Sequence, residues 1–122
     1  MKRIIYFSIL LVLASALLHS CFKEDDFDET LLHGRWKPES GTSLYFRYDS
    51  NGEGVTWNPK VDQLESEGQR FTWELVQSEL TQIHFMEIGG VGIPKIYTVT
   101  ELTETRLRYK DSFSNYSFSK MP

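Results

Sequence analysis

The feature that most restricts the fold of this chain is an alternation of apolar and polar residues that recurs between positions 34 and 120. Phe71, Trp73 and Leu75, for example, are separated by single polar residues. Successive side chains of a β-strand point to opposite faces, so a period of two predicts strands that bury one face. The same stretch shows no helical stripe of useful length. The pattern therefore predicts an all-β domain.

The alternating segments are short, and turns join most of them. The predicted strands cover residues 34–37, 44–48, 55–57, 70–75, 80–88, 93–100, 106–110 and 116–119. About eight short strands at roughly ten-residue spacing are typical of an antiparallel sandwich or barrel. Closure into a barrel removes the strand edges that would otherwise pair with other chains. We therefore predict a small eight-stranded antiparallel up-and-down β-barrel.

Two of the connections carry specific signals. Ser50, Asn51 and Gly52 mark a tight hairpin turn, because Asn-Gly tolerates positive φ at both central positions. The longest connection, residues 58–68, is compatible with a helical turn. A loop of this length often closes one mouth of a barrel or forms a contact surface.

One face of the predicted strands would fill the barrel. The expected inward residues are Trp36, Leu44, Phe46, Tyr48, Trp57, Phe71, Trp73, Leu75, Tyr97, Val99, Leu107, Tyr109, Tyr116 and Phe118. An eight-stranded barrel is just wide enough to be filled by side chains or to hold one small ligand. The first alternative is a solid core, since each aromatic side chain buries about 150–250 Å². The second is a small apolar pocket near one mouth, with tyrosine hydroxyls for orientation and with Trp57, Trp73 and Tyr97 in its wall.

The first twenty residues differ from the rest of the chain. Lys2 and Arg3 precede an apolar run at residues 4–18 that only Ser8 and Ser15 interrupt. A membrane-spanning helix needs about 20 apolar residues, whereas a basic start followed by a shorter apolar run is typical of a secretory signal. We interpret residues 1–20 as a signal peptide.

The signal peptide would end at a cysteine. Residues 18–21 read Leu-His-Ser-Cys, and Cys21 is the only cysteine of the chain. The segment resembles the lipobox of bacterial lipoproteins, which implies lipidation of Cys21 and attachment to the outer membrane. Several acyl chains on one residue give stable anchoring. The alternative is a signal-anchor helix with an ordinary buried cysteine; in either case a lone cysteine excludes an internal disulfide and a cysteine-based zinc site.

Residues 21–30 are interpreted as an acidic tether between the lipid and the domain at residues 31–122. Positions 22–29 contain five acidic residues and one basic residue, Lys23. Such a segment stays hydrated and extended. A lysine followed by acids just after the lipidated cysteine resembles the surface-export signal of Bacteroidota lipoproteins. This resemblance implies exposure at the cell surface, with the inner leaflet of the outer membrane as the alternative.

The start of the domain also carries a family resemblance. Gly34-Arg35-Trp36 resembles the Gly-x-Trp motif of the lipocalin group. Together with the lipobox, the turn at 49–54, the segment at 93–99 and the ending at 116–120, it makes residues 31–121 similar to small lipocalin-like lipoproteins of Bacteroides and relatives, whose functions are largely unassigned. In that group the tryptophan closes one barrel end beneath a cationic residue of the last strand. The resemblance thus implies a barrel-end closure by Gly34, Trp36 and Lys120.

Composition and motifs disfavour several functions. The formal net charge of −4 leaves no basic field for a phosphate backbone, so no nucleic-acid partner is expected. The chain contains no Gly-x-Ser-x-Gly elbow, P-loop or dinucleotide-binding glycine pattern. His33 and His84 lack the spacing of metal ligands. We therefore expect no enzyme activity, no cofactor and no metal site.

The predicted function is the binding of a small apolar or amphipathic ligand by a lipid-anchored barrel. The alternative is an accessory subunit of a cell-envelope complex with a solid core, which would contact its protein partner through loops such as residues 58–68. An enzyme of the calycin type is a third, weaker alternative. An internal void favours ligand binding, whereas a solid interior with an exposed apolar patch at one rim favours the accessory subunit.

Overall fold

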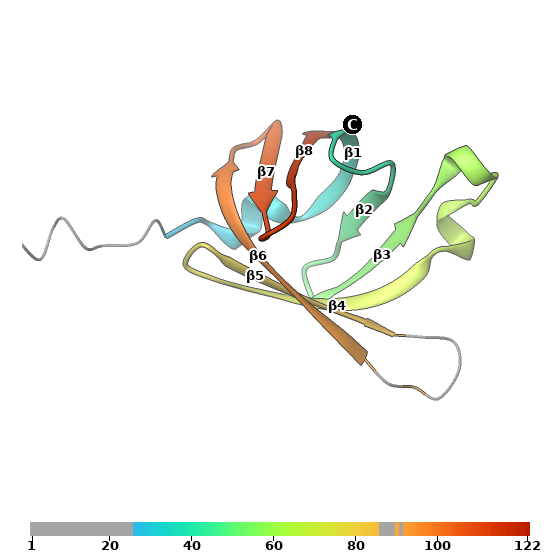
Figure 1. Cartoon of the computed structure of the whole chain (residues 1–122), viewed down its shortest axis with the longest axis horizontal. Helices are drawn as coiled ribbons and strands as arrows, with labels where there is room; N and C mark the ends of the chain where they lie inside the picture. The colour runs from blue at the N-terminus through green and yellow to red at the C-terminus, as the bar shows by residue number, and fades with distance from the viewer. Residues whose placement is uncertain (1–25, 86–89, 91) are drawn as a thin grey trace, which may run out of the picture.

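The computed structural model describes residues 26–85, 90 and 92–122. Its strands are β1 (Gly34–Ser40), β2 (Tyr45–Tyr48), β3 (Glu53–Trp57), β4 (Gln69–Val76), β5 (Glu79–Phe85), β6 (Gly92–Leu102), β7 (Arg106–Lys110) and β8 (Asn115–Lys120). Each strand pairs antiparallel with the next, and β8 pairs with β1 to close the barrel (Figure 1). The predicted eight-stranded up-and-down barrel is confirmed.

Short 3₁₀ turns are the only helical elements in the described part of the chain: η1 (Glu29–Leu32), η2 (Pro59–Val61) and η3 (Glu65–Glu67). The connection at residues 58–68, which was compatible with a helical turn, therefore contains two such turns, η2 and η3. No helix among the described residues has the length and apolar character needed to cross a membrane. Residues 86–88, the last of the strand predicted at 80–88, lie outside the described residues.

The up-and-down order gives the barrel two different ends. We call one the closed end; it carries η1 and the turns at residues 49–52, 77–78 and 103–105. We call the other the mouth; it carries residues 41–44, 58–68 and 111–114. The Leu32 side chain of η1 is fully buried in the core, so η1 covers the closed end.

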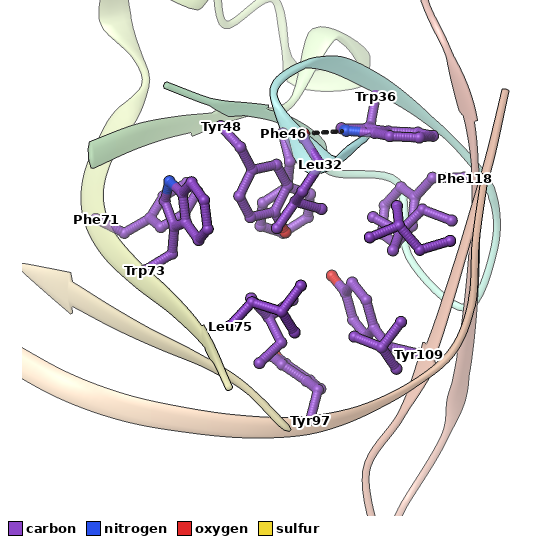
Figure 2. Close-up of a cluster of buried hydrophobic side chains, with 14 residues drawn as sticks. Leu32, Trp36, Phe46, Tyr48, Phe71, Trp73, Leu75, Tyr97, Tyr109 and Phe118 are labelled. Atoms are coloured by element: carbon purple, nitrogen blue, oxygen red, sulfur yellow. Dashed lines mark hydrogen bonds between the residues drawn. The ribbon is translucent and has the colours of Figure 1, made fainter. Parts of the chain in front are cut away.

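The core is largely aromatic and matches most of the predicted inward face. Phe46 contacts Phe118 edge to face, with ring centroids 5.5 Å apart, and Tyr48 meets Phe71 in the same way at 5.5 Å (Figure 2). Such edge-to-face pairs add about 0.5–1.5 kcal/mol beyond the area that they bury. The core also contains residues that were not predicted to face inward: Leu32, Leu80 and Leu102. Leu44 and Tyr116 are only partly buried against it.

The prediction that Trp57 faces the interior is wrong. Tyr45 pairs with Trp57 and Tyr48 with Gly54, so Trp57 shares the outer face with Tyr45, whose ring centroid lies 5.6 Å away. The inward positions of β3 are taken by Gly54 and Thr56. Trp57 is nevertheless buried, with only 6% of its surface exposed.

The cause is the hairpin between β2 and β3. A two-residue turn centred on Asn51 and Gly52 would pair Phe46 with Trp57. The observed turn has three residues between Asp49 and Glu53, which are joined by a hydrogen bond of 2.8 Å from the Asp49 N–H to the Glu53 carbonyl. Only its last residue, Gly52, has positive φ (+82°). One extra turn residue shifts the register by one and moves every side chain of the strand to the other face.

Glu65 in η3 fastens the long connection to the outer surface. Its Oε1 accepts hydrogen bonds from Arg35 Nε at 2.8 Å and from Arg47 Nη1 at 3.0 Å. These groups are partly exposed, and exposed ion pairs contribute little. We expect Glu65→Gln to lower the free energy of unfolding by about 0.5–1 kcal/mol in urea titrations. Glu74→Gln, which breaks no ion pair within the described residues, should change it less; an equal loss would contradict the role of the two arginines.

Candidate functional site

A cavity of about 250 Å³ opens at the mouth of the barrel. Its lining combines mouth residues with inward side chains of the strands: Gly41, Thr42, Leu44, Phe46, Thr56, Gln69, Gln82, His84, Lys95, Tyr97, Tyr109 and Tyr116. A hollow of about 300 Å³ elsewhere is lined in part by outward-facing residues such as Arg47 and Arg70. The cavity at the mouth reaches the fully buried Gln82, so it is a space inside the barrel.

A buried polar chain forms the inner wall of this cavity. The Gln82 side chain is fully buried, and its amide nitrogen donates a hydrogen bond of 2.8 Å to the Tyr48 hydroxyl. The carbonyl oxygen of the same amide then faces His84 Nε2, also at 2.8 Å. His84 Nε2 therefore carries the proton and donates, because a carbonyl can only accept. Among the described residues no group bonds to His84 Nδ1, which is left as an acceptor.

His84 lies in an environment that keeps it neutral. Its ring stacks on Phe71 with centroids 5.1 Å apart. Burial and the nearby positive charge of Lys95 lower the pKa of His84 to about 4. Both causes disfavour the charged imidazolium. The cavity therefore presents a neutral imidazole at pH 7.

Three tyrosines form the other side of the cavity. The ring centroids of Tyr97 and Tyr109 are 4.5 Å apart, and Tyr116 lies 5.7 Å from Tyr97 and 5.3 Å from Tyr109. Burial raises the pKa of Tyr97 to about 12, with a smaller effect from Tyr116 and Asp111. The hydroxyl groups thus stay protonated and can donate or accept hydrogen bonds.

The three residues predicted to line a pocket are not brought together. Tyr97 lines the cavity. Trp73 is buried, but its Nε1 donates to the Glu53 carbonyl at 2.9 Å, and its ring meets His33 at 5.7 Å near the closed end. Trp57 lies on the outer face, for the reason given above. The expected apolar wall is therefore replaced by a polar and aromatic one.

Sequence reasoning missed Gln82 and His84 as cavity residues. In β5 the apolar Ile83 and Phe85 are 37% and 40% exposed, whereas Gln82 and His84 are buried. From hydrophobicity alone, Ile83 and Phe85 would be expected to face the interior, and Gln82 and His84 the solvent. The signal that could have found them is Leu80, since residues two and four positions after a buried leucine share its face.

The barrel-end residues that the resemblance implied do lie together at the closed end. Trp36 is fully buried, and its Nε1 donates a hydrogen bond of 2.8 Å to the Leu32 carbonyl (Figure 2). Lys120 Nζ lies 4.6 Å from the centre of the Trp36 ring and donates to the carbonyls of Leu31 and His33. Gly34 has φ +120°, and a Cβ there would approach Lys120 Cε at 2.8 Å.

Cys21, the predicted lipidation site, lies outside the described residues. In the part of the chain that is described, no cluster of three histidine, cysteine or acidic side chains could hold a metal ion.

Comparison with known proteins supports the fold. No protein-family model matches the chain, and no curated protein matches it. The structure is similar to the crystal structure of a lipocalin-like protein from Bacteroides uniformis ATCC 8492, with a TM-score of 0.57 and 15% sequence identity. The likeness covers 75% of this chain and 99% of that one. The resemblance seen in the sequence is thereby confirmed at the level of architecture: the protein is a lipocalin-like β-barrel.

Proposed function

We propose that the protein binds a small amphipathic molecule in the cavity at the mouth of its barrel and does not transform it. The observation that carries this proposal is the inward placement of Gln82 and His84. Burying polar groups costs free energy unless each is hydrogen-bonded, so an interior that served only stability would hold apolar side chains. His84 Nδ1 has no hydrogen-bond partner among the described residues, so it can accept a hydrogen bond from a molecule in the cavity that His84 lines.

The dimensions of the cavity restrict the ligand. Pockets for drug-sized molecules measure about 300–1,000 Å³, so 250 Å³ suits a smaller compound. The tyrosine rings offer flat apolar contact, while Gln82 and His84 offer polar contact. The described lining residues include no carboxylate or cysteine.

Filling the cavity tests this function. Leu44 is only partly buried at the mouth, and a tryptophan there would occupy the entrance. We expect native mass spectrometry of the full-length protein to show a co-purifying small molecule that Leu44→Trp loses. Thr98→Trp adds the same ring to an exposed position of β6 and should retain the ligand. A molecule that stays bound to Leu44→Trp would place binding elsewhere.

We also propose that Cys21 carries a lipid that attaches the protein to the outer membrane, with the barrel at the cell surface. The sequence supports this through the lipobox-like residues 18–21 and the acidic stretch that follows. We expect Cys21→Ala to move the protein from the membrane fraction to the soluble fraction. Mass spectrometry of the wild-type N-terminus should show an acylated Cys21, and antibody labelling of intact cells should detect the barrel. A Cys21→Ala protein that stays with the membrane would contradict the anchor.

Exposed apolar residues near the mouth favour a second candidate function, contact with a protein of the cell envelope. Val61 and Leu64 in the long connection are 69% and 65% exposed, and Phe113 in the turn before β8 is 91% exposed. Exposed apolar side chains that gather at one end can mark an interface. If Val61→Ser with Leu64→Ser abolished co-purification of an envelope protein while Leu44→Trp had no effect, this second function would replace the first.

A further inference from the structure

The charge of the cavity differs in sign from that of the whole chain. The protein has a formal net charge of −4. Among the described residues that line the cavity, however, Lys95 is the only one with a formal charge, because burial keeps His84 neutral. A ligand entering at the mouth therefore meets a positive group in its immediate surroundings.

The strand pairing fixes Lys95 on the inner side of the mouth. Lys95 pairs with Gln82 across β5 and β6, and paired residues share a face of the sheet. Lys95 therefore lies beside Gln82 in the sheet, but Gln82 is fully buried whereas Lys95 is exposed. Tyr97 lies two residues further along β6 and shares this face. Lys95 and Tyr97 are thus neighbours in the wall of the cavity.

Asp111, a carboxylate at the rim that lines a neighbouring hollow together with Lys95, is already hydrogen-bonded. Asp111 accepts hydrogen bonds of 2.8 Å from the Phe113 and Ser114 N–H groups and one of 3.1 Å from the Tyr116 hydroxyl. Within the described residues, no carboxylate lies within 4.0 Å of the Lys95 ammonium. The lysine is therefore placed to interact with a charge that the ligand brings.

We infer that the ligand is a small organic anion with a planar ring, whose negative group contacts Lys95 at the mouth while its ring lies against Tyr97 and Tyr116. This inference rests on the proposed binding function and adds the chemical class of the ligand. A hydrogen bond between oppositely charged groups is stronger than one between neutral groups, and tyrosine rings give a planar body contact at small entropic cost.

Two probes that differ only in charge test the inference. The full-length protein in non-ionic detergent is titrated with 2-naphthoate and with the neutral 2-naphthamide, and the heat of binding is recorded. We expect the wild type to bind the anion at least about tenfold more tightly, as a charged hydrogen bond predicts. Lys95→Met should remove this preference and Lys95→Arg should keep it. The preference should also decrease at high salt, because the contact is partly exposed.

Lys110→Met is the matched control. Lys110 lies at the mouth end of β7 and is exposed, and its neighbour Tyr109 faces the core, so Lys110 points outward. This variant changes the net charge by the same amount as Lys95→Met and should keep the preference. Unchanged binding of 2-naphthamide to Lys95→Met shows that the cavity itself is intact.

The possible failures are distinguishable. If the wild type binds both probes equally, or if Lys95→Met keeps the preference, the inference about charge is overturned while the binding function stands. If neither probe binds the wild type, the ligand class is overturned. If both probes bind Leu44→Trp as tightly as they bind the wild type, the proposed cavity function is overturned as well.

Discussion

Replacement of Trp36 with alanine is expected to lower the free energy of unfolding by about 3–5 kcal/mol, the usual cost of truncating a buried tryptophan. Trp36 is fully buried, so its loss leaves a cavity at the closed end. The substitution also leaves the Leu32 carbonyl without the indole N–H and removes the ring beneath Lys120. Urea denaturation of the full-length protein measures the change.

Two further variants separate the causes of this loss. Trp36→Phe keeps a ring under Lys120 and loses the indole hydrogen bond, so its cost should be smaller than that of Trp36→Ala. Phe113→Ala removes an aromatic side chain that is 91% exposed and should change the free energy of unfolding by less than about 0.5 kcal/mol. A loss below about 1 kcal/mol for Trp36→Ala would show that the closed end tolerates the cavity.

Acidification is expected to destabilise the protein through His84. The pKa of His84 is lowered by burial and by Lys95 from 6.5 to about 4. As the pH falls below 6.5, the unfolded chain takes up a proton that the folded chain still refuses, so unfolding becomes more favourable. The stability that the neutral form provides is complete above pH 6.5 and is lost as the pH falls toward 4. Between pH 7 and pH 5 the expected loss is about 2 kcal/mol.

The comparison with His84→Phe isolates this effect. Phenylalanine can still stack on Phe71 and does not titrate, so the free energy of unfolding of this variant should change less between pH 7 and pH 5. Asp111 and Glu65 also have lowered pKa values, but they lose their contribution mainly below their ordinary pKa values of 3.8 and 4.5. Equal pH dependence in the wild type and the variant would contradict the assignment. Urea titrations at each pH provide the measurement.

The barrel could be predicted because its signal is repeated along the whole domain. The alternation of Phe71, Trp73 and Leu75 recurs in other strands, and each repetition supports the same buried face. Closure of the barrel followed from the number of strands and the shortness of most turns. A period that is repeated in many strands still predicts the fold when one strand is misassigned. The predicted fold therefore matches the structure although Trp57 of β3 was assigned to the wrong face.

The cavity could be predicted only in part, because the residues that form its wall depend on the register of individual strands. One additional residue in the turn at 50–52 moved Trp57 from the expected interior to the outer face. In β5 the inward positions hold Gln82 and His84, which hydrophobicity assigns to the surface. Their burial follows from hydrogen bonds to Tyr48 and to each other, and partners distant in the sequence cannot be read from composition.

The separation of the two barrel ends has a consequence for how such a scaffold can diversify. None of the residues that cover the closed end lines the cavity at the mouth; they are Leu32, Gly34, Trp36 and Lys120. Phe46, Tyr97 and Tyr109 belong to both the lining and the core, so only the lining positions at the rim can vary without disturbing the packing of the domain. A library confined to exposed or partly buried lining positions such as Leu44, Gln69 and Lys95 could be selected for new compounds, which would make the barrel a starting point for engineered biosensors.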